Sequence, residues 1–402
     1  MTTVRRGRDI LMVPGPTPVP DRILAAMHRQ PVDFASPDFV SLCDRLFEEV
    51  KVLFETTAQV FLYTANGHGA WEAALANTLS PGDTVLIPEV GQFSEGWRAM
   101  ADAMDLRCET IPNDWRHPID PARVADALRA DKAGKIKAVL IVHTDTAASI
   151  TSDIAGIRQA IDSVGHDALY MVDTIASLGT SPYKMDAWGV DVTVAASQKG
   201  LMLPPGLGLV AANEKAQTRG RGATMPRRYW DWVERNAGQH YQRFCGTAPE
   251  LMIFGLDEAL KMLAEEGLDA AIARHARLAD AVRAAVAAWA QGGALSFNAL
   301  DPASRANSVT TVLMPDGVDP ELIRTPARES FGVSISKGLG RLGGSAFRIG
   351  HMGDINEPMV LGGLATIDMV MRRIGLPIGT GAIDAAIDSL AAQPVEQVRA
   401  AE

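Results

Sequence analysis

Between about residues 59 and 213 the chain alternates short apolar runs with segments of helix length. The runs are hydrophobic at successive positions rather than at every second one, which is typical of strands covered on both faces. Strands of this kind, joined by helices, form a doubly wound, mostly parallel α/β sheet. We expect strands at residues 59–63, 84–88, 138–142, 168–172, 191–195 and 208–211. We expect helices at residues 68–79, 94–104, 121–130 and 153–164, the last with Asp153 as its N-cap.

After about residue 249 the pattern changes to long helices with only a few strands. Helices are expected at residues 249–266, 268–290, 319–331 and 357–374, with Gly267 ending the first. Strands are expected at 309–314, 333–336 and 347–350. This second half predicts a smaller α+β domain. We therefore divide the chain into an N-terminal segment (1–20), a large α/β domain (21–265), a small C-terminal α+β domain (266–380) and an Ala-rich tail (381–402) that forms a short helix or a frayed end.

Composition narrows the class of partner. The 402 residues carry a formal net charge of −10, which argues against nonspecific binding to nucleic acid or to an anionic membrane and favours small-molecule substrates. The least charged stretch, residues 200–213, is too short to span a bilayer. Arg5, Arg6 and Arg8 are followed by an apolar run too short for a signal peptide. Three cysteines without a CxxC pair suit reduced thiols, so we expect a cytoplasmic protein. The eight histidines show no metal-ligand spacing, and no metal is expected.

Three features carry chemistry. Gly67, His68 and Gly69 follow a strand and open a helix, where free backbone N–H groups attract an anion; glycines also begin helices for steric reasons. Asp173 ends an apolar strand, where a carboxylate needs a cationic partner such as a pyridinium nitrogen; it could equally cap a loop. Lys199 also follows a strand, and desolvation there would make it a nucleophilic amine; alone, it could be an ordinary exposed lysine.

Taken together, the three features favour the functional interpretation of each residue over its alternative. A phosphate cradle, a strand-end aspartate and a strand-end lysine in one doubly wound sheet are what pyridoxal 5′-phosphate requires. The sequence therefore predicts an enzyme that uses this cofactor.

The chain also resembles the class V, fold type I aminotransferases, and within them the serine–glyoxylate and alanine–glyoxylate aminotransferases. The resemblance extends over most of the chain. Its motifs are Val13-Pro14-Gly15-Pro16-Thr17, Trp71-Glu72-Ala73-Ala74, Asn77 to Asp83, Trp188-Gly189-Val190-Asp191, Ser197 to Gly206, Tyr229-Trp230-Asp231-Trp232, Glu265 to Leu268 and Phe347-Arg348-Ile349-Gly350-His351.

The resemblance implies a role for each matching residue. Lys199 would form the Schiff base with the cofactor and move the proton of the substrate Cα, and Asp173 would pair with the ring nitrogen. Arg348 would bind the substrate α-carboxylate through a bidentate pair. The remaining cofactor contacts would be Phe93 and Ile175 on the two ring faces, Thr146 at the phenolic oxygen, and Gly67, His68, Gly69 and Gln198 at the phosphate. Thr247, with Phe244, would reach the phosphate in the other subunit, which implies a homodimer that could pair into a tetramer.

The N-terminal segment, through Gly15, and the residue Phe34 would adjoin the substrate. Here the chain departs from the family. Phe34-Ala35-Ser36-Pro37-Asp38-Phe39 stands where the family usually has His-Arg-Ser/Gly-Pro-Glu-Phe, which removes two polar groups. His143 to Ser149 and Thr247 to Glu250 also differ from the usual His-Asn-Glu-Thr-Ser-Thr-Gly and Thr-Pro-Ala-Thr. These differences concern the amino donor and not the cofactor chemistry.

The predicted reaction is transfer of an amino group from serine or alanine to a 2-oxo acid, with glyoxylate as the expected acceptor. The alternatives are another donor, such as aspartate, ureidoglycine or another amine, or pyruvate as acceptor. A fold type I lyase such as a cysteine desulfurase is a further alternative, with Cys245 as its only candidate nucleophile. Neither Phe244 nor Gly246 offers a cation that would lower the pKa of this thiol.

Overall fold

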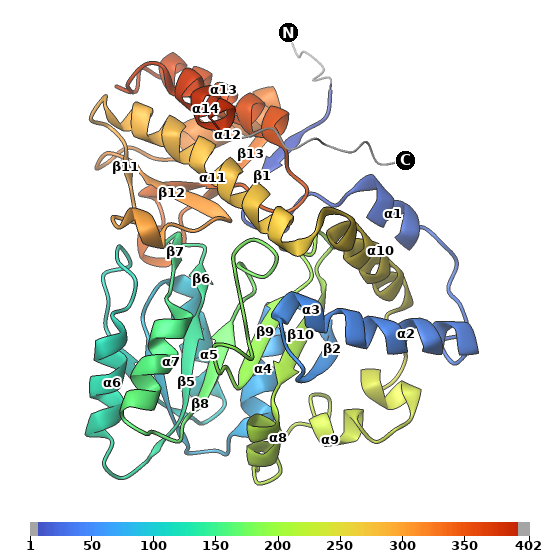
Figure 1. Ribbon diagram of the computed structural model, residues 1–402. Coiled ribbons are helices and arrows are strands. Elements are labelled where there is room, and N and C mark those ends of the chain that lie inside the picture. The colour runs from blue at the N-terminus through green and yellow to red at the C-terminus, as the bar shows by residue number, and fades with distance from the viewer. Residues whose placement is uncertain (1–6, 393–402) are drawn as a thin grey trace.

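The computed structural model describes residues 7–392 and contains two large β-sheets (Figure 1) and a short two-stranded one. Arg5, Arg6 and the end of the predicted 381–402 tail lie outside the described residues. The larger sheet has seven strands in the order β2-β10-β9-β8-β5-β3-β4. Its bounds are β2 Gln59–Ala65, β3 Thr84–Pro88, β4 Arg107–Ile111, β5 Ile136–Val142, β8 Leu169–Asp173, β9 Val192–Ala196 and β10 Gly206–Ala212. Only β10 runs antiparallel to its neighbours, β2 and β9.

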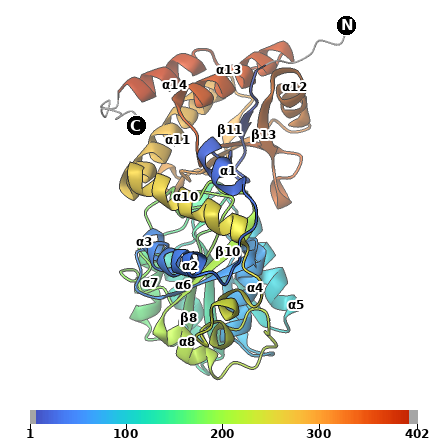
Figure 2. The same cartoon turned by 90° about the vertical axis from the view of Figure 1, so that its right-hand side faces the viewer.

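Helices lie on both faces of this sheet. They are α4 Gly67–Thr78, α5 Gln92–Ala103, α6 Pro121–Ala130, α7 Ile154–Ser163 and α8 Glu214–Gly220, preceded in the chain by α1 Asp21–Met27, α2 Pro37–Glu49 and α3 Lys51–Phe54. Figure 2 shows the sheet between α4 and α5 on one side and α2, α3, α6 and α7 on the other. The predicted mostly parallel sheet is confirmed, and the six predicted strands begin and end within two residues of the expected positions. Asp153 caps α7 by accepting a hydrogen bond from the Gly156 amide, as predicted.

The smaller sheet has five strands in the order β1-β13-β14-β12-β11. These are β1 Ile10–Met12, β11 Ser296–Phe297, β12 Val309–Leu313, β13 Val333–Lys337 and β14 Ala346–Gly350. Its helices are α11 Leu268–Ala290, α12 Glu321–Phe331, α13 Glu357–Arg373 and α14 Ala382–Ala391. Strand β1 pairs in parallel with β13, so the N-terminal segment completes this sheet.

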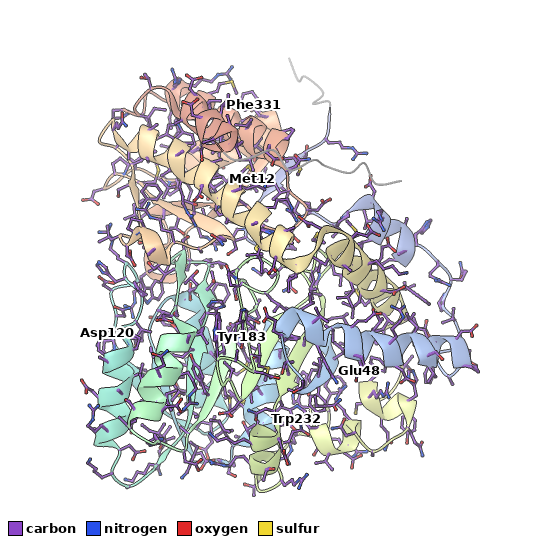
Figure 3. All side chains as sticks on the ribbon, viewed as in Figure 1. Met12, Glu48, Asp120, Tyr183, Trp232 and Phe331 are labelled. Carbon is purple, nitrogen blue, oxygen red and sulfur yellow. The ribbon has the colours of Figure 1, made fainter. Side chains whose placement is uncertain are left out.

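Each of the two large sheets has its own core. Figure 3 shows Tyr183 and Trp232 within the larger core and Met12 within the smaller one. Helix α11 contacts both, since Ala271 packs in the larger core and Leu278 in the smaller one. The division at residues 20, 265 and 380 stays a prediction, because β1 and α11 tie the two parts together.

Five strands were not expected from the sequence, one of them the two-residue strand β11 of the smaller sheet. The others are β1, the edge strand β4, and the two-residue strands β6 Thr144–Asp145 and β7 Ile150–Thr151. Along the chain, α8 is followed by α9 Trp232–Arg235, a 3-10 helix η1 His240–Phe244, and α10 Glu250–Glu266. Among residues 7–392, no helix combines the length and the apolar character that a membrane span requires.

Candidate active site

The site is built where strands of the larger sheet end. Asp173 is the last residue of β8, and Lys199 comes three residues after β9, which pairs in parallel with β8. Gly67 begins α4, directly after β2. Because the carboxyl ends of parallel strands meet at one edge of a sheet, Asp173 and Lys199 come together there.

Lys199 projects from this edge toward the N-terminal segment. Its Nζ donates a hydrogen bond to the carbonyl of Pro14, and Thr17 Oγ1 donates to the Lys199 carbonyl at 3.1 Å. A Cβ on Gly15 would lie 2.5 Å from Lys199 Nζ, and Gly15 has a φ of +107°. Glycine is therefore required where the N-terminal segment passes the lysine. Gly15 thus contacts the predicted catalytic residue directly.

Burial controls the charge of Lys199. Desolvation, assisted by the nearby Arg348 cation, lowers the pKa of Lys199 to about 8, while the negative charges of Asp173 and Asp145 oppose this shift. A substantial fraction of the amine is then neutral near pH 7–8, and the neutral form is the nucleophile.

Asp173 is almost fully buried, with 3% of its surface exposed. The indole N–H of Trp71 donates to Oδ2 at 2.9 Å, and the Ile175 amide donates to Oδ1 at 2.7 Å. Burial nevertheless raises the pKa of Asp173 to about 7. Within residues 7–392 Asp173 forms no salt bridge, so the carboxylate would be stabilised by a cation placed beside it.

Two amides of the expected phosphate cradle have an acceptor within the chain that the sequence argument did not identify. Asn66 is the N-cap of α4, and its side chain accepts hydrogen bonds from the amides of His68 and Gly69, at 3.0 and 3.3 Å. The expectation that these amides are free is therefore wrong for His68 and Gly69, which are paired with Asn66. A Cβ on Gly67 would lie 2.3 Å from Ile175 Cδ1, so the predicted ring-face residue packs directly on the cradle.

Gln198 lies beside Lys199 in the sequence and is half-buried. Its buried Oε1 has no hydrogen-bond partner among the described residues. A buried polar atom without a partner is costly and marks a place for a polar ligand. The observation fits the predicted contact between Gln198 and a phosphate.

Arg348 extends from β14 toward the larger sheet. Its Nε donates to the Lys337 carbonyl at 2.7 Å and Nη1 to the Thr146 carbonyl at 3.0 Å. Arg348 is only 6% exposed, and it forms no salt bridge with any residue between 7 and 392. Burial lowers the pKa of Arg348 to about 10, yet the side chain stays charged at neutral pH. A buried cation without a paired carboxylate favours an anionic ligand.

Phe93 and Thr146 meet at a buried carboxylate that the sequence argument did not identify. Asp145 accepts a hydrogen bond from the Phe93 amide at 2.7 Å and is fully buried. Thr146 follows Asp145 directly and is 1% exposed. The Phe93 ring lies edge-on to Trp71, with 6.4 Å between ring centroids. The only signal for Asp145 in the sequence was its position, where the family usually has glutamate.

Three predicted site residues lie apart from this group. Phe34 and the buried Phe244 pack against the larger core near η1, while Thr247 is exposed between η1 and α10. In Figure 1 the chain leading into α2 lies at the right-hand margin, away from the ends of β8 and β9. The Phe244 side chain packs on Phe47, 6.0 Å between centroids, so it is held by its own subunit. Among the described residues, no hydrogen bond, ion pair or ring contact joins these three residues to Lys199 of the same chain.

The residues around Lys199 fit pyridoxal phosphate. Asp173 needs a cationic partner, Gln198 has an unpaired polar atom, and Lys199 supplies an amine of lowered pKa. Among residues 7–392, no group of three or more His, Cys, Asp or Glu side chains could hold a metal ion. Cys245 is exposed, and its Sγ lies 3.9 Å from the Arg228 carbonyl.

Comparison with known proteins agrees with this geometry. A model of the aminotransferase class-V family matches residues 18–342. The chain is 42% identical over 393 residues to serine–glyoxylate aminotransferase of Methylorubrum extorquens, covering 96% of this chain and 97% of that protein. It is 39% identical over 372 residues to L-aspartate–glyoxylate aminotransferase of Paracoccus denitrificans, covering 92% and 93%. The crystal structure of ureidoglycine–glyoxylate aminotransferase from Bacillus subtilis has a TM-score of 0.88 at 27% identity, covering 97% of this chain and all of that one.

The fold and the site together define a pyridoxal-phosphate-dependent transaminase of fold type I. The chain belongs to the class V aminotransferase family.

Proposed function

We propose that the protein transfers the amino group of a small amino acid, serine or alanine, to glyoxylate. The observation that carries this proposal is Arg348, a buried cation without a carboxylate partner among the described residues. One such cation suits substrates with a single carboxylate. The likeness to serine–glyoxylate aminotransferase supports serine as donor and glyoxylate as acceptor.

In this proposal each residue has a defined task. Pyridoxal phosphate, when bound, serves as the electron sink for the bond that breaks at the substrate Cα. Lys199 would hold the cofactor through its Nζ and would accept and return the proton of the substrate Cα. Asp173 would hold the ring nitrogen in its protonated form, and Arg348 would hold the substrate carboxylate and so fix the orientation of the Cα–H bond.

Aspartate is the alternative donor with the most support, because the chain is 39% identical to an L-aspartate–glyoxylate aminotransferase. Phe34 and Ala35 replace a polar pair of the family, and a more apolar pocket would disfavour the hydroxyl of serine and so favour alanine between the two proposed donors. Ureidoglycine as donor and pyruvate as acceptor stay open as further alternatives.

A donor-by-acceptor screen tests the proposal. Steady-state rates with serine, alanine, aspartate and other amines at fixed glyoxylate should be fastest with serine or alanine. Negligible rates with both, beside a fast rate with another amine, would refute the donor assignment and leave the transaminase assignment intact. Arg348→Ala should lower kcat/KM. The corresponding loss of transition-state stabilisation should be roughly 2–4 kcal/mol, the scale for removing one partner of a desolvated charge pair.

We further propose a cytoplasmic homodimer, or a tetramer of two such dimers, with active sites shared between subunits. The separation of Phe34 and Thr247 from Lys199 of the same chain supports this arrangement, because these residues would then serve the site of the other subunit.

A further inference from the structure

Asp145 is a buried carboxylate in the site to which the reaction described above assigns no task. It lies in β6 and is fully buried. Both carboxylate oxygens accept backbone hydrogen bonds. The Phe93 amide donates to Oδ2 at 2.7 Å, and the amides of Ala147 and Ala148 donate to Oδ1 at 2.8 and 3.3 Å. One side chain therefore joins two segments that are 52 residues apart in sequence.

The first segment carries Phe93 at the start of α5. This helix begins close against the carboxylate, because a Cβ on the N-cap residue Gly91 would lie 2.1 Å from Asp145 Cγ. Gly91 itself has an extended backbone with a φ of 170°, so the demand for glycine is steric. The position of the Phe93 backbone thus depends on Asp145.

The second segment is the turn at residues 146–149, which contacts Arg348. The Thr146 carbonyl accepts from Arg348 Nη1 at 3.0 Å. The Ala147 carbonyl accepts from Thr311 Oγ1 at 2.9 Å, and Thr311 pairs with Arg348 in the smaller sheet. The turn that Asp145 holds therefore supports both the Arg348 guanidinium and the neighbouring strand.

The negative charge of Asp145 also acts on Arg348 and Lys199. Burial is the main cause that lowers the pKa values of both Arg348 and Lys199, and Asp145 is a negative charge that opposes the shift in each. Asp145 thus helps to keep Arg348 cationic in an apolar setting.

We propose that Asp145 is a positioning residue that fixes, through one carboxylate, both the aromatic ring that faces the cofactor and the arginine that binds the substrate carboxylate. The inference rests on the roles proposed above for Phe93 and Arg348. Its distinctive consequence is that cofactor affinity and carboxylate affinity must change together when Asp145 changes.

Asp145→Asn is the direct test, because the amide keeps the shape but can accept on one oxygen only. Two binding constants are measured on the whole protein. The first is the Kd of pyridoxal phosphate for the apoenzyme. The second is the Kd of propionate, a carboxylate without an amine, followed through the visible band of the cofactor-loaded enzyme. Both should rise about tenfold or more, as expected when a hydrogen bond to a buried charge is lost.

Asp153→Asn is the matched control. Asp153 also accepts a backbone amide and also lies against a glycine, since a Cβ on Gly156 would be 2.2 Å from Asp153 Oδ2. It caps α7 outside the site, so both constants should stay at their wild-type values. Gly91→Ala is a second variant that displaces the Asp145 carboxylate without removing its charge, and it should raise both constants if Asp145→Asn does not fold.

A rise in only one constant, or in neither, would overturn the proposal. These measurements do not require turnover. A wild-type enzyme that uses neither serine nor alanine would refute the proposed donors while leaving the Asp145 test valid.

Discussion

Burial, rather than any single neighbouring charge, sets the ionisation of the two residues that would contact the cofactor. It lowers the pKa of Lys199 to about 8 and raises the pKa of Asp173 to about 7. The two groups thus become partly neutral in the same pH range, although one is a base and the other an acid. A cofactor with an aldehyde and a basic ring nitrogen would use both, since the neutral amine attacks the aldehyde and the carboxylate stabilises the protonated ring.

The first prediction concerns Lys199 itself. Lys199→Ala should abolish the borohydride-reducible link to the cofactor and lower kcat by about 10³-fold or more, because both the covalent anchor and the proton carrier are lost. Peptide mapping by mass spectrometry after reduction locates the link. Lys184→Ala is the control, since Lys184 is half exposed and pairs with Glu55. Finding the cofactor on another lysine would overturn the assignment of Lys199.

The second prediction concerns the pH dependence of cofactor attachment. The rate at which apoenzyme binds pyridoxal phosphate covalently should rise through about pH 8, where Lys199 loses its proton. Arg348 lowers the pKa of this amine, so Arg348→Ala should raise the pKa and move the midpoint to higher pH. Arg348→Lys keeps a positive charge and should move it less. The same midpoint in all three proteins would contradict the electrostatic coupling.

At the scale of elements, the N-terminal segment and β14 cross at close range. A Cβ on Gly350, the last residue of β14, would lie 2.2 Å from the carbonyl carbon of Val13. The clash would be with backbone atoms, so it cannot be relieved by the rotation of a side chain. The segment that continues to Pro14 and Gly15 beside Lys199 is therefore positioned by the strand that carries Arg348.

The third prediction follows from this crossing. Gly350→Ala should destabilise the protein by about 1–3 kcal/mol, the usual cost of overpacking, and should lower activity because the contact of Pro14 with Lys199 is displaced. Thermal or urea unfolding and kcat/KM measure the two effects. Gly362→Ala in α13 is the control, since its Cβ would meet only Ile10 Cδ1, at 3.4 Å. In a helix this change should stabilise by up to about 1 kcal/mol. Equal effects of the two substitutions would refute the steric argument.

The helices and strands that could be predicted from the sequence were those with a clear local pattern. Runs such as residues 138–142 are apolar throughout and were recognised as buried strands. Strand β4 was missed because Arg107 and Glu109 are exposed on an edge, and β1 because three residues show no period. The strand-end positions of Asp173 and Lys199 follow from local pattern as well. Asp145 does not, because its hydrogen bond to Phe93 depends on how distant segments pack.

In the whole molecule, the predicted site residues fall into two groups, which the proposed dimer would bring together. Lys199, Asp173 and Arg348 form one region, and Phe34, Phe244 and Thr247 form another near η1. Exposed apolar side chains lie close to the second region, with Val233 62% and Tyr241 49% exposed. Such a surface suits contact with another subunit. The arrangement supports a twofold dimer in which each subunit completes the site of the other.

The last prediction tests this sharing by mixing inactive subunits. A Lys199→Ala subunit keeps Thr247, and a subunit with Thr247→Arg keeps Lys199, so a mixed dimer with shared sites contains one intact site. Random mixing makes half of the dimers mixed, and activity should recover to about a quarter of the wild-type value. Mixing Lys199→Ala with Arg348→Ala is the control, because both residues belong to the same region, each site of the mixed dimer then lacks one of them, and no activity should return. Recovery in the control, no recovery in the test pair, or full activity in a monomer at low concentration would each contradict shared sites.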